Sequence, residues 1–240
     1  MRYGLLVDIH ANAVALEKVV AAIRAEGVDA FHHVGDVVGY GAQPAECLQI
    51  LRDLSCEVVC GNHDAAVVGT LELDYFNPFA REAVLWTRAT LSQEDRDWLA
   101  ALPLIRKGAD FTLVHGTPYA PEMFHYLQSI PEAERSFQAL DRPVCFVGHS
   151  HVPVAFFGGR SISYSLDPEI TVEPEGRTLV NIGSVGQPRD DDTRAAYAIY
   201  DTEKKKVWIR RVQYDVDAAA AKILAAGLPE ILGERLRWGR

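Results

Sequence analysis

The sequence predicts an α/β protein in which two β-sheets pack together and helices cover them on the outside. Strand-like and helix-like patterns alternate over the first 65 residues, and short strand-like segments follow one another between residues 153 and 213. Hydrophobic residues make up 48% of the 240, which is enough to fill a core of this size. Because the sequence contains no repeat and no interdomain linker, we expect residues 1–240 to form a single domain.

The N-terminal section alternates between buried strands and amphipathic helices. Leu16, Val19, Val20 and Ile23 repeat at the spacing of one helix face, and Pro44 suits the first turn of a helix. Strands that alternate with helices join through right-handed crossovers, so this section predicts a parallel sheet that is buried on both faces. Its elements are expected at residues 2–7 (strand), 12–26 (helix), 30–34 (strand), 44–54 (helix) and 57–60 (strand).

The rest of the chain combines a helical segment with many short strands. Residues 64–102 are expected to be mainly helical, and apolar runs predict further strands at 110–114 and 143–147. A final amphipathic helix is expected at about 215–226. Between these parts, Gly and Pro separate strand candidates that we assign to an antiparallel second sheet, at 153–157, 161–164, 177–181, 195–200 and 206–213.

Charge and cysteine content narrow the function classes. The formal net charge is −9, and an acidic surface cannot gain affinity for a nucleic-acid backbone by releasing counterions, so we expect no non-specific nucleic-acid binding. No apolar stretch approaches the roughly 18 residues of a membrane span, and the N-terminus lacks the pattern of a signal peptide. The four cysteines form no CxxC pair and suit reduced thiols. We therefore expect a cytoplasmic protein without membrane partners.

Five short segments place Asp, Asn or His directly after apolar, strand-like runs. The carboxyl ends of strands are where open α/β sheets collect ligands, so we expect these side chains to converge on one edge. The set contains carboxylate, imidazole and amide groups without thiolate, which suits Mn²⁺, Fe or Zn²⁺ in a site for two metal ions. The segments are Asp8-Ile9-His10, Gly35-Asp36, Gly61-Asn62-His63-Asp64, His115-Gly116 and Gly148-His149-Ser150-His151.

The spacing within these segments has a physical basis. If the strand geometry continues through Asp8 and His10, the two side chains point to the same side, and His149 and His151 repeat this spacing. Asp36 lies between the other ligand segments in sequence, and its two carboxylate oxygens can bridge two cations. Each segment alone fits an ordinary turn or a buried histidine. Their joint occurrence after apolar strands favours a metal site.

Together these segments resemble the signature of the calcineurin-like metallophosphoesterases. All five occur in the order found in that family, between residues 8 and 151. A later segment, residues 181–189, is similar to one in the small bacterial and archaeal phosphodiesterase branch of the family. The resemblance implies a four-layer α-β-β-α sandwich with two packed mixed sheets, which agrees with the pattern of elements described above.

The resemblance also implies a role for each residue. Two divalent metal ions would be bound, with manganese expected and iron or zinc also suited to the ligands. His63 would lie near the leaving-group oxygen, as a general acid or as a stabiliser of developing charge, and Asp64 would orient its imidazole and raise its pKa. One metal would take Asp8, His10, Asp36 and His151, and the other would take Asp36, Asn62, His115 and His149.

One departure from the family pattern bears on the substrate. The protein Ser/Thr phosphatases of the family carry Asp-Arg where this chain has Gly39-Tyr40, and their Arg grips phosphate. The protein phosphatase branch is therefore disfavoured. Asn12, Tyr40 and Arg189 remain as candidate substrate contacts, although Arg189 fits a solvated loop equally well.

The function that the resemblance implies is hydrolysis of a phosphodiester of nucleotide type, a small phosphate-ester substrate. Two cations about 3.5–4 Å apart would hold a bridging hydroxide that attacks phosphorus in line. A dinucleoside polyphosphate hydrolase and a phosphomonoesterase are alternatives, and a non-catalytic interaction scaffold is a third. The scaffold is disfavoured because every ligand candidate and His63 are present. We expect the loops 64–80, 117–130 and 186–194 to set specificity.

Overall fold

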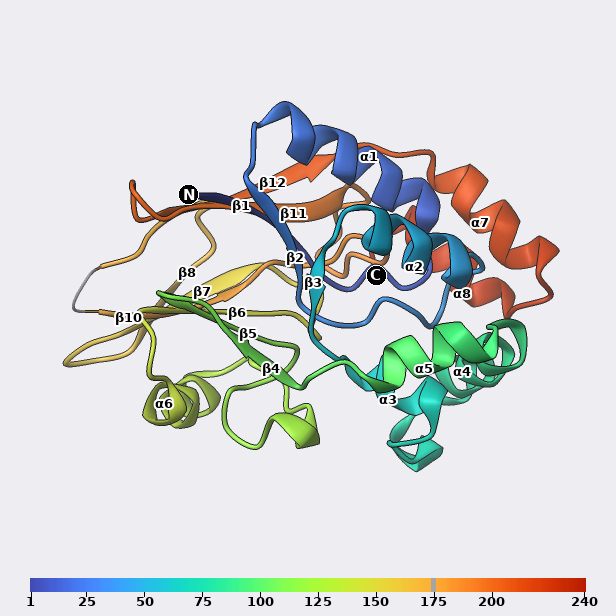
Figure 1. Cartoon of the computed structure of the whole chain (residues 1–240), viewed down its shortest axis with the longest axis horizontal. Helices are drawn as coiled ribbons and strands as arrows, with labels where there is room; N and C mark the ends of the chain where they lie inside the picture. Colours follow the sequence, from blue (N-terminus) through green and yellow to red (C-terminus); the bar gives the residue numbers. More distant parts are fainter. Residues whose placement is uncertain (174–175) are drawn as a thin grey trace.

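Two six-stranded mixed sheets pack face to face, and helices cover their outer faces (Figure 1). The computed structural model describes residues 1–173 and 176–240. The arrangement confirms the predicted α/β class, with two packed mixed sheets between layers of helices. Among the described residues, no helix is both long enough and apolar enough to cross a membrane.

The first sheet joins strands from the start of the chain to strands from its last third. Its order is β3 (Glu57–Val58), β2 (Ala30–His33), β1 (Arg2–Leu6), β11 (Ala195–Asp201), β12 (Lys206–Val212) and β9 (Glu169–Thr171). β1, β2 and β3 run parallel, as the alternating sequence pattern predicts. β11 adds antiparallel to β1, and all of its residues are buried because both faces of this strand are covered.

The second sheet is built around two parallel strand pairs. Its order is β4 (Ile105–Lys107), β5 (Phe111–Val114), β6 (Val144–Val147), β10 (Arg177–Asn181), β7 (Val154–Gly158) and β8 (Ser163–Ser165). β5 and β10 each pair in parallel with β6, whereas the two edges of the sheet are antiparallel. β4 was not predicted, because three residues of which none is fully buried carry little periodic signal.

The later strands do not form a sheet of their own, so the antiparallel second sheet predicted from residues 153–213 is wrong. β7, β8 and β10 complete the second sheet, whereas β9, β11 and β12 join the first. Alternation of apolar and polar residues shows which side chains share a face of a strand, but it does not identify the neighbouring strand. The positions of most of these strands were nevertheless predicted to within two residues.

Three apolar layers hold the sandwich together. Leu5, Phe146 and Tyr200 lie between the two sheets and are almost completely buried. Leu16 belongs to α1 (Ala13–Ala25) and packs over the outer face of the first sheet. Phe137 belongs to α6 (Ile130–Ala139) and packs over the outer face of the second. Burial of each large side chain stabilises the fold by roughly 2 kcal/mol, so all three layers contribute.

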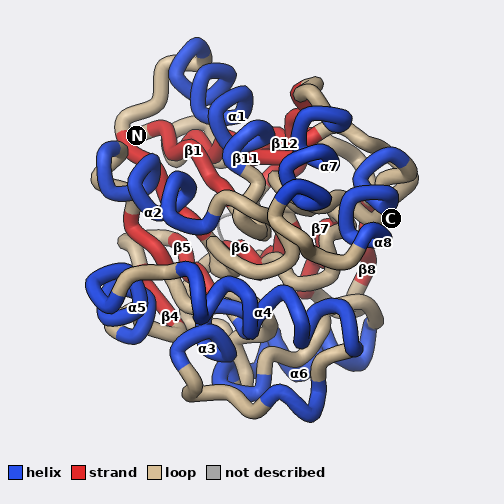
Figure 2. The backbone as a smooth tube through the Cα atoms, turned by 90° about the vertical axis from the view of Figure 1, so that its right-hand side faces the viewer, coloured by secondary structure: helices blue, strands red, loops and turns tan. Residues whose placement is uncertain are grey.

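The remaining helices surround the strands in two groups (Figure 2). They are α2 (Pro44–Asp53), α3 (Asn62–Val68), α4 (Pro78–Thr90), α5 (Gln93–Ala100), α7 (Val216–Ala225) and α8 (Glu230–Glu234). Short 3₁₀ turns are η1 (Leu73–Tyr75), η2 (Pro121–Met123) and η3 (Arg235–Arg237). Figure 2 shows α1, α2, α7 and α8 on one side of the strands and α3 to α6 on the other. The helical prediction for residues 64–102 is met by α3, η1, α4 and α5.

Candidate metal centre

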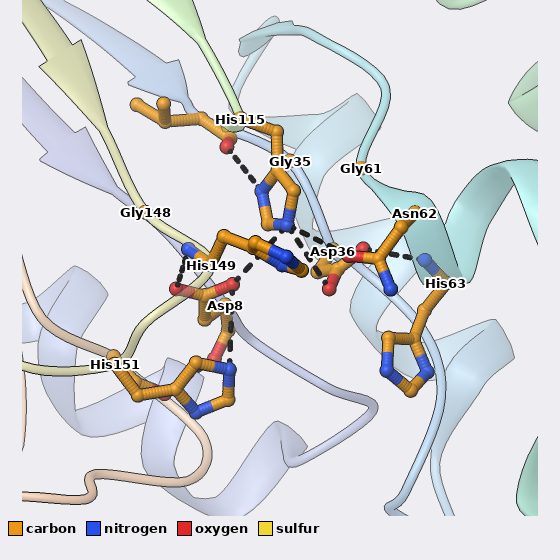
Figure 3. Close-up of polar contacts among 12 residues, drawn as sticks. Asp8, Gly35, Asp36, Gly61, Asn62, His63, His115, Gly148, His149 and His151 are labelled. Carbon is orange, nitrogen blue, oxygen red and sulfur yellow. Dashed lines mark hydrogen bonds and ion pairs between the residues drawn. The ribbon is translucent and has the colours of Figure 1, made fainter. Parts of the chain in front are cut away.

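The five predicted ligand segments follow the carboxyl ends of β1, β2, β3, β5 and β6 and converge on one point (Figure 3). Asp8 lies two residues beyond β1, and Asp36 lies three beyond β2. His115 directly follows β5, His149 lies two residues beyond β6, and Asn62 is the first residue of α3. The first sheet therefore supplies Asp8 and Asp36, while the second supplies His115 and His149. Packing of the sheets brings these two sets of side chains together.

The ligand segments do not continue the strands, as the sequence analysis assumed for Asp8 and His10. β1 ends at Leu6, and Asp8 and His10 both take left-handed backbone conformations, with φ of 50° and 48°. His149 and His151 repeat this pattern, with φ of 68° and 61°. Such conformations are uncommon for residues other than glycine and concentrate at functional sites. The alternate side chains meet because the backbone coils back at each strand end.

Two groups of ligand atoms lie close enough to hold metal ions. One atom each from Asp8, His10 and His151 lie within 4.8 Å of one another, and so do atoms from Asp36, His115 and His149. His10 connects the groups, since its Nε2 is 3.8 Å from an oxygen of Asp8 and 3.7 Å from one of Asp36. A third such group joins His10 and Asp36 to His63.

Asn62 completes the cluster beside His115. Its Oδ1 lies 3.1 Å from Nε2 of His115, which is itself 3.2 Å from Oδ2 of Asp36. The structure therefore brings together all seven side chains that the sequence analysis named as ligands.

Backbone carbonyls fix which nitrogen of three histidines faces the cluster. Nδ1 of His10 lies 3.1 Å from the carbonyl oxygen of Val38, and Nδ1 of His115 lies 2.9 Å from that of Val34. Nδ1 of His151 lies 2.6 Å from the carbonyl oxygen of Gln187. A carbonyl can only accept, so the proton of each neutral ring belongs on Nδ1. The Nε2 lone pairs then point into the cluster, which is the arrangement found in metal-ligating histidines.

The buried position of the cluster suits positive ions. All seven ligand candidates except Asn62 are buried, and Oδ1 of Asp8 has no hydrogen-bond partner among the described residues. Burial raises the pKa of Asp8 to about 8, and burial also lowers the pKa values of His10 and His151 well below their usual range. Neutral imidazoles are ready to ligate, and a cation would restore the charge on the Asp8 carboxylate. The residues therefore fit a metal centre.

His63 lies beside the cluster, and its ring packs against aromatic side chains. Its backbone N–H donates to Oδ1 of Asp36 over 2.8 Å, which fixes the residue at the start of α3. Its ring contacts the aromatic rings of Tyr40 and Phe76, with centroid distances of 4.4 and 5.0 Å. Nδ1 has no hydrogen-bond partner among the described residues, and burial lowers the pKa of His63 to about 4. The free imidazole is therefore neutral at pH 7.

Asp64 does not contact the His63 ring, so the expectation that it orients this imidazole and raises its pKa is wrong. Its carboxylate accepts hydrogen bonds from four backbone N–H groups over 2.9 to 3.2 Å, those of Asp36, Val37, Val38 and Gly61. The side chain faces back across the start of α3 toward the turn after β2. Asp64 therefore connects the turn that carries Asp36 to the start of α3 through these hydrogen bonds.

The three predicted substrate contacts occupy different positions. Asn12 caps α1, accepting from the N–H of Ala15 over 3.1 Å and donating to the carbonyl of Gly186 over 3.0 Å. Both the oxygen and the nitrogen of its amide are thus hydrogen-bonded within the protein, and Asn12 does not line the pocket beside the cluster. Tyr40 and Arg189 do line that pocket, and the Arg189 guanidinium lies 5.7 Å from the centre of the Tyr40 ring.

A pocket of about 380 Å³ opens beside the ligand cluster. Its polar lining residues are Asp36, Tyr40, Asn62, His63, Asn77, Glu122, His149, His151 and Arg189. The opposite part is largely apolar, with Leu71, Phe76, Ala80, Met123, Phe124 and Tyr126. All three loops expected to set specificity contribute residues. Tyr126 was not identified from the sequence, although its ring stacks on His149 with centroids 3.9 Å apart. A single tyrosine in a loop without periodicity gives no signal that could have found it.

Comparisons with known proteins match this chain over most or all of its length. Residues 1–205 match the calcineurin-like phosphoesterase superfamily domain. The protein MJ0912 of Methanocaldococcus jannaschii is 41% identical over 243 residues, covering 99% of this chain and 98% of its own. A metallophosphoesterase crystal structure from Sphaerobacter thermophilus is 40% identical, with a TM-score of 0.87 and coverage of 100% of this chain and 99% of its own.

A more distant structure shares the fold over the same length. The crystal structure of PH1004 from Pyrococcus horikoshii is 20% identical, with a TM-score of 0.82, and it covers 100% of this chain and 98% of its own. The family match spans most of the chain, and the two relatives near 40% identity match it from end to end. This protein therefore belongs to the calcineurin-like phosphoesterase superfamily.

Proposed function

We propose that this protein hydrolyses phosphodiesters of nucleotide type with the help of two divalent metal ions. The observation that carries the proposal is the pair of three-residue ligand groups, one containing Asp8 and the other containing Asp36, at the wall of a substrate-sized pocket. Membership of a phosphoesterase family supplies the reaction class. The cluster supplies the reason to assign the reaction to this place in the fold.

The proposed ligand sets follow the two groups. Asp8, His10, Asp36 and His151 would hold one ion, and Asp36, Asn62, His115 and His149 would hold the other. When bound, such a pair of cations lowers the pKa of water to give a nucleophile and neutralises charge on the phosphate oxygens. Manganese suits the mixture of carboxylate, imidazole and amide, and iron or zinc would suit it as well.

The other residues would bind and orient the phosphate ester. Arg189 presents a guanidinium to the pocket, which suits the oxygens of a phosphate. His63 would supply a proton to the departing oxygen. Because burial keeps the free imidazole neutral, an anionic phosphate beside it would be needed to raise its pKa and load that proton. Asp64 would act at a distance, by holding the Asp36 turn against α3.

The apolar half of the pocket supports a substrate with a flat organic group. Phe76 and Tyr126 are aromatic, and Met123 provides an adaptable side chain near the opening. A nucleobase could stack in such a space, whereas inorganic phosphate or a small sugar phosphate would leave it unfilled. The net charge of −9 favours a small phosphate ester over a nucleic-acid polymer. Four free cysteines, three of them buried, suit a reducing compartment, so we also propose a cytoplasmic location.

A substrate panel tests the proposal. The protein would be stripped with EDTA, reloaded with Mn²⁺, and assayed on bis-p-nitrophenyl phosphate, p-nitrophenyl phosphate and diadenosine tetraphosphate. We expect hydrolysis that depends on added metal and is fastest on the diester. Faster turnover of the monoester or of the tetraphosphate would replace our substrate class with a phosphomonoesterase or a dinucleoside polyphosphate hydrolase. Absence of metal-dependent hydrolysis on all three would favour the non-catalytic scaffold.

A further inference from the structure

The end of the chain contacts the site although it lies outside the family match, which stops at residue 205. α7, α8 and η3 pack together, and Leu232 and Leu236 share an apolar cluster with Tyr40. Tyr40 itself takes a left-handed backbone conformation, with φ of 57°, and is 7% exposed. The C-terminal helices therefore form part of the support for a residue that lines the pocket.

Two guanidinium groups share the Tyr40 ring. The guanidinium carbon of Arg189 lies 5.7 Å from the ring centre, and that of Arg235 lies 5.9 Å from it. Both distances are within the range of cation–π attraction. Nη2 of Arg189 also lies 3.4 Å from the hydroxyl oxygen of Tyr40. The ring thus connects a residue of the pocket to a residue of the C-terminal turn.

Neither guanidinium pairs with an acidic side chain among the described residues. Arg189 donates to the amide oxygen of Gln187, and Arg235 donates to a main-chain oxygen of Arg240. Burial lowers the pKa of Arg235, and the positive charge of Arg189 lowers it further. The two like charges on one ring repel each other, so the position of the Arg189 guanidinium depends on that of Arg235.

The same C-terminal turn holds the loop that carries Arg189. The N–H of Asp191 donates to the carbonyl of Gly239 over 3.0 Å, and Arg240 pairs with the Asp191 carboxylate. Gly239 has φ of +65°, and a β-carbon there would lie 2.7 Å from the backbone nitrogen of Asp192. The loop and the turn are therefore in close backbone contact two residues from Arg189.

We propose that Arg235 is a positioning residue, which acts through the Tyr40 ring to hold the Arg189 guanidinium in the pocket where phosphate binds. The inference rests on the proposed function, since it gives Arg189 a phosphate to bind. The inference goes beyond the proposed function because it assigns a role at the site to the segment that follows residue 205.

The test combines variants of Arg235 and Arg189 with the manganese-loaded protein. Affinity for inorganic phosphate would be measured by calorimetry, and KM and kcat would be measured with bis-p-nitrophenyl phosphate. We expect R235Q to weaken phosphate binding about fivefold, the size of one cation–π contact, and to raise KM more than it lowers kcat. R235K keeps the charge but loses the planar group, so we expect it to restore part of the affinity.

A double-mutant cycle separates positioning from a general structural effect. If Arg235 acts through Arg189, R235Q should change phosphate affinity less than about twofold in an R189Q background. Arg237 lies in the same turn, pairs with Asp217 at the surface, and provides the matched control R237Q. We expect R237Q to leave affinity and turnover unchanged, and the thermal midpoint of R235Q to match that of wild type.

Three results would overturn the inference. Equal effects of R235Q in the wild-type and R189Q backgrounds would show that Arg235 does not act through Arg189, and the proposed function would stand. Loss of affinity that occurs only with a lower thermal midpoint, in both R235Q and R235K, would show a structural role. Wild-type protein that neither binds phosphate nor hydrolyses the diester would remove the proposed function, and the inference with it.

Discussion

At the scale of single residues, the cluster is organised by backbone groups more than by side-chain pairs. Carbonyls of Val38, Val34 and Gln187 hold the Nδ1 atoms of three histidines. Four N–H groups hold the Asp64 carboxylate. The loops that carry these carbonyl and N–H groups must keep their conformation when no metal is bound. A backbone group, unlike a side chain, cannot change its position by adopting another rotamer. This arrangement prepares the ligands before any ion binds.

Substitution of Asp64 and of His63 should produce different defects. Asp64→Asn replaces a four-fold acceptor with an amide that must turn its NH₂ group toward backbone donors. We expect a loss of about 2–3 kcal/mol in the free energy of unfolding, measured with urea.

His63→Ala removes a ring whose Nδ1 has no partner among the described residues. We expect it to keep bound metal but to lower turnover about 10²-fold or more, the usual contribution of a general acid.

The opposite result for Asp64→Asn would support the role in chemistry that the family resemblance implied for Asp64. An Asp64→Asn protein of wild-type stability that loses turnover as His63→Ala does would mean that the carboxylate serves the chemistry directly. Full activity of His63→Ala on a diester with a poor leaving group would remove the general-acid assignment. Elemental analysis of both variants would show whether turnover is lost because the metal ions are lost.

The side chains that gather in the cluster could be predicted from the sequence, because each belongs to a segment that follows an apolar run. The environment of each side chain could not. Asp64 is adjacent to His63 in sequence, yet its carboxylate turns toward the Asp36 segment, because the N–H groups of the turn after β2 point there. Asn12, a predicted substrate contact, likewise turns its side chain to the backbone, because its position before α1 makes it the helix cap. Local sequence does not show where unpaired backbone donors lie.

At the scale of elements, the strand ends determine the site, and glycines determine how closely the strand ends approach one another. Apolar runs in the sequence predict the positions of β1, β2, β5 and β6. Candidate ligand residues follow these strands, so this part of the fold was predictable. β8 and β9 are three residues long and mostly exposed, so the prediction of 161–164 was displaced by two residues and β9 was absent from it. Short edge strands contain too few buried residues to show a period.

Gly35 gives a test of how close that approach must be. It lies just beyond β2 with φ of +91°, and a β-carbon at this position would meet Nδ1 of His115 at 2.6 Å. Gly35→Ala should therefore displace His115, lowering manganese content and turnover in addition to about 1–2 kcal/mol of stability lost to the left-handed backbone. Gly27→Ala is the matched control, since φ is +69° and no atom lies within 4 Å. It should lose similar stability and keep full metal content, as elemental analysis would show. Equal metal content in the two variants would mean that His115 is not held by this contact.

At the scale of the whole molecule, the cluster spans the interface between the two sheets. Asp8, His10, Asp36 and Asn62 follow strands of the first sheet, while His115, His149 and His151 follow strands of the second. Each proposed ligand set contains residues from both. An ion bound here would therefore join the sheets at the edge where their strands end. Elsewhere the sheets are joined by apolar packing, and by Tyr200 of β11, whose hydroxyl donates to Asp110 over 2.9 Å.

Metal binding should accordingly stabilise the folded state as a whole. An ion that binds only the folded protein adds about 2.7 kcal/mol to the free energy of unfolding at a free concentration of 100 times its Kd. We expect Mn²⁺ to raise the urea midpoint of EDTA-stripped protein by the corresponding amount, and Asp36→Asn to abolish the increase because this carboxylate belongs to both ligand sets. Tyr200→Phe is the control: it should lower stability by about 1 kcal/mol with and without metal, since it removes a hydrogen bond between the sheets away from the ligands. An equal response of wild type and Asp36→Asn to Mn²⁺ would mean that the stabilising ion binds at another place.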